Sequence, residues 1–593
     1  MQISFLDWLI IFSFFGIFIL IGFITSKKSG ENSKEFFLSG RNMPWWMLGI
    51  SMVATTFSAD TPNLVTNIVR ENGVSGNWAW WAFLLTGMMT VFFYAKLWRR
   101  SKVLTDLEFY ELRYSGKPAK YLRAFRALYL GVFFNVMIMA SVCLAGIKIG
   151  GILLGLSPFE CVFYSSVITV FYSSLGGLRS VVITDLIQFI LAMIGSLWAC
   201  VYILNLNEVG GLNNLINNPL VVDKLNFFPD VNDKETFLTI LIIPLAVQWW
   251  AVWYPGAEPG GGGYIAQRML SAKDEKSAVY STLLFNVAHY ALRPWPWILI
   301  ALSSIIVYPS LSDISSAFPS VDKSIIGNDI AYPAMLYLLP SGLLGLVLAS
   351  LIAAFMSTIS SHLNWGASYI SLDFYKRFVN KDASEKQVVF VGRISTIILM
   401  FLAGFLALNL SDALGAFQIL LQIGAGTGSI FLLRWFWWRV NAYSEITGMV
   451  VSFLLAIYFQ WFHYDLTGIQ LESYEKLLWS IFLTTSSWII VTFLTKPSDK
   501  NTLKEFYSRI KPYGIGWNGF LSISNIPKSD HNNEESPMRD LLLMFLGVFT
   551  VYFGLFGTGL LIYGNFLFGN LLLIISFVSA YFTNYIMSYK DKS

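Results

Sequence analysis

Residues 353–371 place an unusual number of hydroxyl side chains within an apolar stretch of sequence. Two sets recur at the spacing i, i+3, i+4: Ala354, Ser357, Thr358 and Ser357, Ser360, Ser361. An α-helix puts each set on one face. Inside a membrane, such hydroxyls either bond neighbouring helices together or line a polar site. Beside free backbone carbonyls they would form a neutral oxygen cage, which suits a hard cation such as Na⁺.

Two carboxylates, Asp60 and Asp185, also lie in apolar segments. A carboxylate in the hydrocarbon region is costly, so it should face a cavity or a partner. Asp60 stands two residues before Pro62 and could instead cap a helix end near water. Asp185 follows the sequence GGLRS and could equally be a helix N-terminal acid that the macrodipole favours. The residues themselves leave both alternatives open.

The composition indicates a polytopic membrane protein, because 55% of residues are hydrophobic and 13% are charged. The net charge of +4 is small, and Lys and Arg cluster in short loops rather than forming a nucleic-acid surface. The three cysteines and four histidines show no disulfide or metal-binding spacing. We see no nucleophile–base pair, so we do not expect an enzyme. The sequence also gives no sign of an obligatory protein partner.

The hydropathy pattern predicts an all-α protein with about fifteen membrane-spanning helices. The expected spans are 5–26, 44–69, 78–98, 126–153, 159–175, 181–204, 236–255, 276–307, 342–372, 387–409, 412–435, 442–462, 474–495, 538–562 and 564–587. Every odd-numbered span ends at a loop that contains Lys or Arg, whereas the long loops 206–235 and 308–331 are less basic. The positive-inside rule therefore predicts a multi-pass protein of the inner cell membrane with its N-terminus outside and its C-terminus in the cytoplasm.

Two of the predicted spans are interrupted. Span 44–69 carries the polar sequence TTFSADTP near its middle, and span 236–255 runs into PGAEPGGGG. Pro and Gly break the helical hydrogen-bond ladder and free backbone carbonyls. The two spans are five apart, so they cross in opposite directions. Broken helices at matching positions of two oppositely oriented halves predict a secondary transporter with a 5+5 inverted-repeat core.

This organisation divides the chain into consecutive parts. They are an extra N-terminal helix and cytoplasmic loop (1–43), the first repeat (44–205), an extracytoplasmic loop (206–235), the second repeat (236–435), two additional helices (436–496), a cytoplasmic loop (497–536) and two C-terminal helices (537–593). Tryptophans near span ends, among them Trp78, Trp80 and Trp81, predict an interfacial belt, and second a stacking surface for a solute.

Four motifs resemble those of the sodium:solute symporters, and in particular of sodium/glucose-cotransporter-like proteins. They are FFLSGRNMPWW (36–46), GGLRSVVITDLIQ (176–188), GYIAQRMLSAK (263–273) and AAFMSTISSHLN (353–364). The resemblance covers roughly residues 5–440 and implies the inverted-repeat fold of leucine-transporter-like proteins. The second to sixth and the seventh to eleventh spans would then form the two halves.

The resemblance implies one sodium site, and in some members two. The positions that match the first site are the carbonyls of Ala54, Phe57 and Ala354 and the hydroxyls of Ser357 and Thr358. The resemblance to members such as sialic acid transporters implies a second sodium site. The residues that match it here are Asp185, Ser357, Ser360 and Ser361. Na⁺ is therefore the expected coupling ion, with one or two bound.

The solute site of sugar-transporting members is matched less well. Their acid–amide pair becomes Asp60 and Thr61, so the amide is missing, and their inner-gate tyrosine matches Tyr264. A lysine of theirs aligns near His289. Gln418 and Gln422, at i and i+4, stand where family members contact solute. A polar, hydrogen-bonding solute (sugar-like, an amino acid or a carboxylate) is expected.

These observations predict a sodium-coupled symporter that imports a small polar solute across the lipid bilayer by alternating access. A proton-coupled carrier of the same fold, using Asp60 or Asp185, is an alternative that uptake following pH rather than sodium would favour. A membrane sensor signalling through residues 497–536 is a further alternative, although that segment carries no kinase, phosphatase or nucleotide motif.

Overall fold

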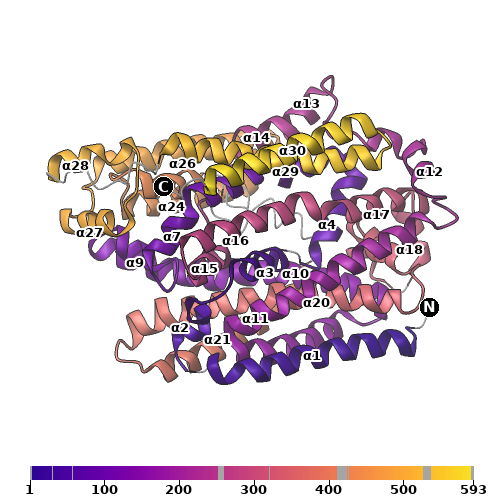
Figure 1. Cartoon of the computed structure of the whole chain (residues 1–593), viewed down its shortest axis with the longest axis horizontal. Coiled ribbons are helices and arrows are strands. Elements are labelled where there is room, and N and C mark those ends of the chain that lie inside the picture. The colour runs from indigo at the N-terminus through magenta and orange to yellow at the C-terminus, as the bar shows by residue number, and fades with distance from the viewer. Residues whose placement is uncertain are drawn as a thin grey trace.

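The computed structural model describes residues 3–29, 31–56, 58–250, 259–319, 321–410, 424, 426–524 and 536–588. Within these ranges the chain is all-helical and contains no β-strand; one isolated bridge joins Met43 to Ala272. The long helices run side by side along the longest axis of the molecule (Figure 1). The start of α1 and the end of α30 lie toward opposite ends of this bundle (Figure 1).

The first part of the bundle contains α1 (Phe5–Ser29), α2 (Ser33–Leu38), α3 (Trp45–Thr56), α4 (Asp60–Asn72), α5 (Trp78–Trp81), α6 (Leu84–Met89), α7 (Ala95–Ser101), α8 (Glu108–Arg113), α9 (Gly116–Leu128), α10 (Asn135–Leu154), α11 (Pro158–Leu204), α12 (Leu212–Asn217), α13 (Lys234–Phe237) and α14 (Ile243–Ala246). The second part contains α15 (Gly263–Ser271), α16 (Glu275–Val287), α17 (Pro294–Val307), α18 (Leu311–Ala317), α19 (Ala331–Leu336), α20 (Leu343–Ser368), α21 (Glu385–Ala407), α23 (Gly428–Phe436), α24 (Ala442–Ile457), α25 (His463–Thr467), α26 (Ser473–Leu494), α27 (Lys500–Ile510), α28 (Asn518–Ser524), α29 (Pro537–Ile562) and α30 (Phe566–Ser588). Short 3₁₀ or π segments that bear on the site are η8 (Ala288–Leu292), η10 (Asn328–Ile330) and η11 (Tyr369–Val379).

Among the described residues, 11 helical segments are long and apolar enough to cross a membrane. Each coincides with one of the spans expected from hydropathy. The remaining expected spans are 44–69, which is broken, 159–175, which is short, and 236–255 and 412–435, which extend beyond the described ranges. The predicted interruption of span 44–69 is confirmed, because α3 ends at Thr56 and α4 begins at Asp60.

The helix α11 joins two expected spans through a kink at Gly177. This residue has φ 54° and ψ −160°, a backbone conformation that favours glycine. A Cβ at this position would lie 2.6 Å from the Phe36 carbonyl oxygen. The glycine therefore allows α2 to pack closely against α11, which positions the second half of α11 and its Asp185.

The central helix α20 is held at its N-terminal end by the peripheral helix α1. The Asp7 carboxylate accepts hydrogen bonds from the backbone N–H groups of Gly342, at 2.7 Å, and Gly345, at 2.8 Å. It also accepts one from the Ser4 hydroxyl, at 2.6 Å. Orphan N–H groups at a helix start need such acceptors, and a carboxylate also complements the helix dipole. The buried Asp7 thereby fixes α1 to the helix that carries the hydroxyl face.

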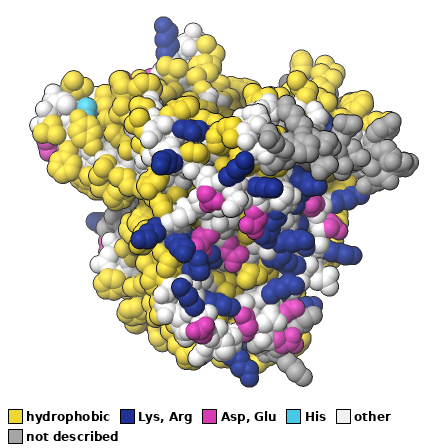
Figure 2. Space-filling model, turned by 90° about the vertical axis from the view of Figure 1, so that its left-hand side faces the viewer, with side chains coloured by type: hydrophobic (Ala, Val, Ile, Leu, Met, Phe, Trp, Pro, Cys, Tyr) yellow, Lys and Arg dark blue, Asp and Glu magenta, His cyan; other side chains and the backbone are white. Residues whose placement is uncertain are grey.

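The expected loop 497–536 is partly helical and packs against the body of the protein. The Trp517 indole donates to the Trp435 carbonyl at 2.9 Å and stacks on Phe506 at 5.6 Å. The Arg113 guanidinium lies over both rings. Figure 2 shows Lys and Arg side chains gathered at this end of the bundle, with Asp and Glu side chains among them.

Replacing Asp7 with Ala should lower the stability of the whole bundle, because two N–H groups of α20 lose a charged acceptor. We expect a loss of about 2 kcal/mol in the free energy of unfolding, read as a lower thermal midpoint of the detergent-purified protein. Gly345→Ala should have a similar effect, since its Cβ would lie 2.5 Å from the Asp7 Cα. Asp223→Ala, at an exposed position, serves as the control; an equal loss there would contradict the anchoring role.

Candidate functional site

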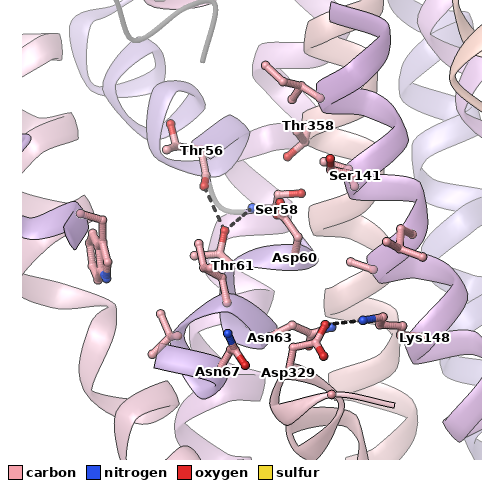
Figure 3. A pocket seen from close by; sticks show the side chains of 18 of the residues that line it. Thr56, Ser58, Asp60, Thr61, Asn63, Asn67, Ser141, Lys148, Asp329 and Thr358 are labelled. Atoms are coloured by element: carbon pink, nitrogen blue, oxygen red, sulfur yellow. Dashed lines mark hydrogen bonds and ion pairs between the residues drawn. The ribbon is translucent and has the colours of Figure 1, made fainter. Parts of the chain in front are cut away.

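A cavity of about 510 Å³ opens beside the break between α3 and α4. Figure 3 shows polar residues of α4 along one side and residues of α10 along the other. Its polar lining consists of Thr55, Thr56, Ser58, Asp60, Thr61, Asn63, Asn67, Glu71, Ser141, Lys148, His289, Arg293, Asn328, Asp329, Thr358 and His362. The broken helix, α10 and the hydroxyl-rich α20 therefore meet at one polar chamber.

The break leaves backbone carbonyls at the end of α3 that side chains satisfy. The Thr358 hydroxyl donates to the Thr55 carbonyl at 2.8 Å. The Arg293 guanidinium donates to the carbonyls of Val53 and Thr56, each at 3.4 Å. Because no water reaches such carbonyls in a membrane core, they need partners from other helices. The end of α3 is thus a group of oxygen acceptors facing α20.

Asp185 lies at the centre of a second, fully buried cluster. Its two oxygens accept hydrogen bonds from the hydroxyls of Ser357 and Ser51, each at 2.5 Å. The Arg268 guanidinium lies 3.8 Å from the carboxylate and donates to the Ser361 hydroxyl at 2.6 Å. Asp185 and Arg268 are both inaccessible to solvent, so each neutralises the charge of the other.

The structure brings together most of the residues proposed for the two sodium sites. Ala54 and Ala354 are buried in α3 and α20, while Phe57 lies outside the described residues. Ser361 lies 2.8 Å from the Thr55 hydroxyl rather than against Asp185. The Ser360 hydroxyl donates within its own helix, to the Ser357 carbonyl at 3.1 Å.

The solute residues expected from the sequence lie around the base of the cavity, as far as they are described. Asp60 is the first residue of α4, and Thr61 follows it. The Tyr264 hydroxyl lies 2.8 Å from that of Thr56 in the fully buried first turn of α15. His289 lines the cavity and contacts Arg293 through its Nδ1. Gln418 and Gln422 lie outside the described residues.

An ion pair crosses the mouth of the cavity. Lys148 of α10 lies 2.6 Å from Asp329 of η10 (Figure 3). Arg70 at the end of α4 contacts the same η10 segment, because it donates to the Asn328 side chain at 3.0 Å. It also donates to the Tyr308 carbonyl, just after α17, at 2.9 Å. Lys148 therefore has a specific partner inside the protein instead of extending to the interface.

The wall between base and mouth carries a buried amide and two aromatic rings. Asn63 is 3% exposed, and both polar atoms of its side chain lack a hydrogen-bond partner among the described residues. Trp80 stacks on Tyr290, with ring centroids 5.7 Å apart and ring planes 21° from parallel. Both rings line the cavity. Trp78 and Trp81, expected at the membrane interface, are instead buried against Phe556.

The segment that precedes α8 joins α15 to η11 through Asp106. Asp106 accepts a hydrogen bond from the Gly263 N–H at 2.9 Å and from the Tyr369 hydroxyl at 2.5 Å. It thereby joins the start of α15 to η11. Nearby, burial alone would raise the pKa of Glu111, but hydrogen bonds from Arg377 and Arg123 outweigh it and hold that pKa below its usual value.

Sequence reasoning missed Arg268, Arg293 and Asn63 as site residues. A signal existed for the two arginines, because a guanidinium in a helix between apolar residues must have a buried partner. Arg293 also directly precedes the PWPW sequence that starts α17. Asn63 carried no such signal, since an amide next to Pro62 also suits a helix end.

Breaking the Arg268–Asp185 pair should destabilise the protein strongly in sodium-free buffer. We expect Arg268→Met to cost about 3–5 kcal/mol, because it leaves a buried carboxylate without a counter-charge. Adding Asp185→Asn should restore part of this loss. Thermal unfolding of the two single variants and the double variant measures the coupling. The partly exposed pair Lys376–Glu385, at 2.7 Å, is the control and should show little coupling. Strictly additive effects at Asp185 and Arg268 would contradict the pairing.

Comparison with known proteins identifies several relatives. A sodium/glucose cotransporter of Vibrio parahaemolyticus is 24% identical over 515 residues, covering 84% of this chain and 92% of the relative. Sodium/glucose cotransporter 1 of Mus musculus is 27% identical over 514 residues (78% and 74%). Sodium/myo-inositol cotransporter 2 of Homo sapiens is 26% identical over 517 residues (80% and 74%).

The solved structure of a Na⁺-coupled sialic acid symporter, in a substrate-bound outward-open state, aligns with a TM-score of 0.65 and 21% identity. The alignment covers 84% of this chain and 99% of that chain. This likeness supports the leucine-transporter-like fold expected from the motifs. The 11 apolar helices among the described residues agree with a multi-pass membrane protein.

The model of the sodium:solute symporter family matches residues 36–452, which include all four motifs and the cavity. The family consists of secondary transporters rather than enzymes, and Na⁺ is its coupling ion. The chain belongs to the sodium:solute symporter family.

Proposed function

We propose that this protein imports a small, uncharged, hydroxyl-rich solute together with Na⁺ by alternating access. The observation that carries the proposal is the contact of the α3 break with the hydroxyl face of α20 at the base of a cavity. A hydroxyl of α20 meets a backbone carbonyl of α3 there, and a cation between the two helices would strengthen their contact.

The first sodium ion would bind between α3 and α20. The supporting residues are Ala54, Phe57, Ala354, Ser357 and Thr358. The Thr358 hydroxyl already bonds the Thr55 carbonyl at 2.8 Å, so carbonyl and hydroxyl oxygens from both helices lie within one ion's reach. Neutral oxygens of this kind suit a monovalent hard cation, which they can bind and release.

A second sodium ion would bind at Asp185. Ser357 supports this assignment through its 2.5 Å hydrogen bond to the carboxylate. Ser360 and Ser361 lie one turn further along α20, where Ser361 contacts Arg268. Ser357 would therefore belong to both sites and couple them.

The solute would occupy the cavity between Asp60, Thr61 and the Trp80–Tyr290 pair. The charges at the mouth are already paired, since Lys148 contacts Asp329. The unpartnered Asn63 amide offers one donor and one acceptor, which match the hydroxyls of a sugar or inositol. Two of the relatives are named as sodium/glucose and sodium/myo-inositol cotransporters, which agrees with a sugar- or inositol-like solute.

Alternating access would involve the 5+5 inverted-repeat core, which makes up ten of the about fifteen expected spans. The η10 segment lines the cavity and lies within the loop expected outside the cell, whereas the Tyr264 hydroxyl contacts Thr56 at the base of the cavity. The conformation would then be outward-facing, with the N-terminus outside and the C-terminus in the cytoplasm. Sodium would favour this state, and release of α15 would open the inner side.

Sodium coupling is tested at the hydroxyl face. In thermal-shift titrations of the purified protein with NaCl against choline chloride, Ser357→Ala and Thr358→Ala should raise the sodium concentration for half-maximal stabilisation about tenfold, because each removes a ligand oxygen. Ser368→Ala is the matched control, because this hydroxyl of the same helix bonds its own backbone. Unchanged sodium dependence in both variants would refute the site. Solute uptake that follows pH and ignores sodium would favour a proton-coupled carrier.

The solute class is tested by the same titrations with sugars, inositol, amino acids and carboxylates, with and without sodium. We expect glucose- or inositol-like compounds to stabilise the protein only with sodium. Asn63→Leu should weaken their binding about tenfold and leave the sodium response intact. Its fold should survive, because the Asn63 amide has no partner among the described residues. Asn409→Leu, at an exposed amide, is the control. Stabilisation by amino acids or carboxylates alone would exclude a sugar-like solute.

A further inference from the structure

A second buried amide without a partner lies next to Asp185. Gln188 is 1% exposed, and neither Oε1 nor Nε2 has a hydrogen-bond partner among the described residues. A buried amide that makes no hydrogen bond costs stability, so each such group needs an explanation. Inside a membrane bundle the usual explanation is function.

The neighbouring residues of α11 show where Gln188 points. One turn before it, Asp185 contacts Ser357 of α20 at 2.5 Å. Two turns after it, Gly195 packs against Ser350 of α20, whose hydroxyl oxygen would lie 3.3 Å from a Cβ. The next residue, Phe189, packs on Val53 and Ala54 of α3. Gln188 shares a face of α11 with Asp185 and Gly195 and therefore faces α20 between Ser350 and Ser357.

This position brings three kinds of oxygen together. Asp185 and Gln188 are three residues apart, so their side chains share one face of α11. Ser357 supplies a hydroxyl that donates to the carboxylate and keeps its own lone pairs free. A carboxylate, a hydroxyl and an amide oxygen are all ligands that hard cations accept.

Arg268 leaves room for such an ion. Its guanidinium lies 3.8 Å from Asp185 Oδ2, the oxygen that accepts the Ser51 hydroxyl. The other oxygen, Oδ1, accepts from Ser357 and faces α20. The arginine and an ion could therefore contact opposite sides of one carboxylate, with the ion on the side of Gln188.

We infer that Gln188 is a sodium ligand, supplying its amide oxygen to an ion held between α11 and α20 by Asp185 and Ser357. The inference rests on the sodium coupling proposed above and extends the second site to a residue of α11. In the ion-bound protein the amide gains the partner that it otherwise lacks. Sodium binding thus repays the cost of burying it.

The test is a thermal-shift titration of the full-length purified protein with NaCl, with choline chloride keeping the ionic strength constant. Gln188→Leu should unfold at the same or a higher temperature than wild type in choline, because it removes an unpartnered amide. Its half-maximal sodium concentration should rise about tenfold. Gln188→Glu should keep the sodium response, since a carboxylate oxygen replaces the amide oxygen. Gln188→Met provides a second oxygen-free variant.

Asn286→Leu is the matched control. It removes another buried amide whose Oδ1 lacks a partner, and it should leave the sodium response unchanged. Superimposable sodium titrations for wild type and Gln188→Leu would overturn the inference, as would a lower midpoint in choline with unchanged sodium affinity. If wild type itself shows no sodium response, or Thr358→Ala leaves it unchanged, the proposed coupling fails. A response lost in Thr358→Ala but kept in Gln188→Leu and Gln188→Met refutes the Gln188 ligand alone.

Discussion

Backbone carbonyls freed inside a membrane must be satisfied by the protein itself, and the structure around the cavity follows from this constraint. The interruption between α3 and α4 exposes such carbonyls at the end of α3. Thr358 of α20 and Arg293, which directly precedes α17, supply the hydrogen bonds that they need. Three segments distant in sequence thereby converge on one break. The carbonyl oxygens that require these partners are also of the kind that binds hard cations. The break that ends α3 therefore supplies candidate ligand atoms.

Two buried charges beside the site are neutralised by a partner from another element. Arg268 lies against Asp185, and Lys148 lies against Asp329. Asp7 is different, because backbone N–H groups at the start of α20 surround it. Removing one member of such a pair leaves a buried charge without a counter-charge and is expensive. These contacts therefore hold the helices of the bundle in their observed arrangement.

The buried polar groups without a hydrogen-bond partner among the described residues include two uncharged amides, one in the cavity and one beside the Asp185 cluster. Asn63 lines the cavity, and Gln188 lies on α11 one turn after Asp185. An amide carries both a donor and an acceptor, so it can bind a hydroxyl or offer its oxygen to a cation. Burying it unpartnered costs free energy that a bound ligand returns. A transporter that must release its ligands gains from such modest, reversible interactions.

The sequence by itself determined the membrane class, the family, most of the spans and the broken helix, because these depend on local hydropathy, on Pro and Gly, and on helical spacing. It also identified the Ser357 and Thr358 face, since i, i+3 and i+4 neighbours share a side of any helix. Only the tertiary structure decided the partners. Lys148 could not be matched to Asp329, nor Arg268 to Asp185, because pairs so far apart along the chain leave no trace in its periodicity. Burial of Trp78 and Trp81 likewise depends on α29, which packs against them from the far end of the sequence.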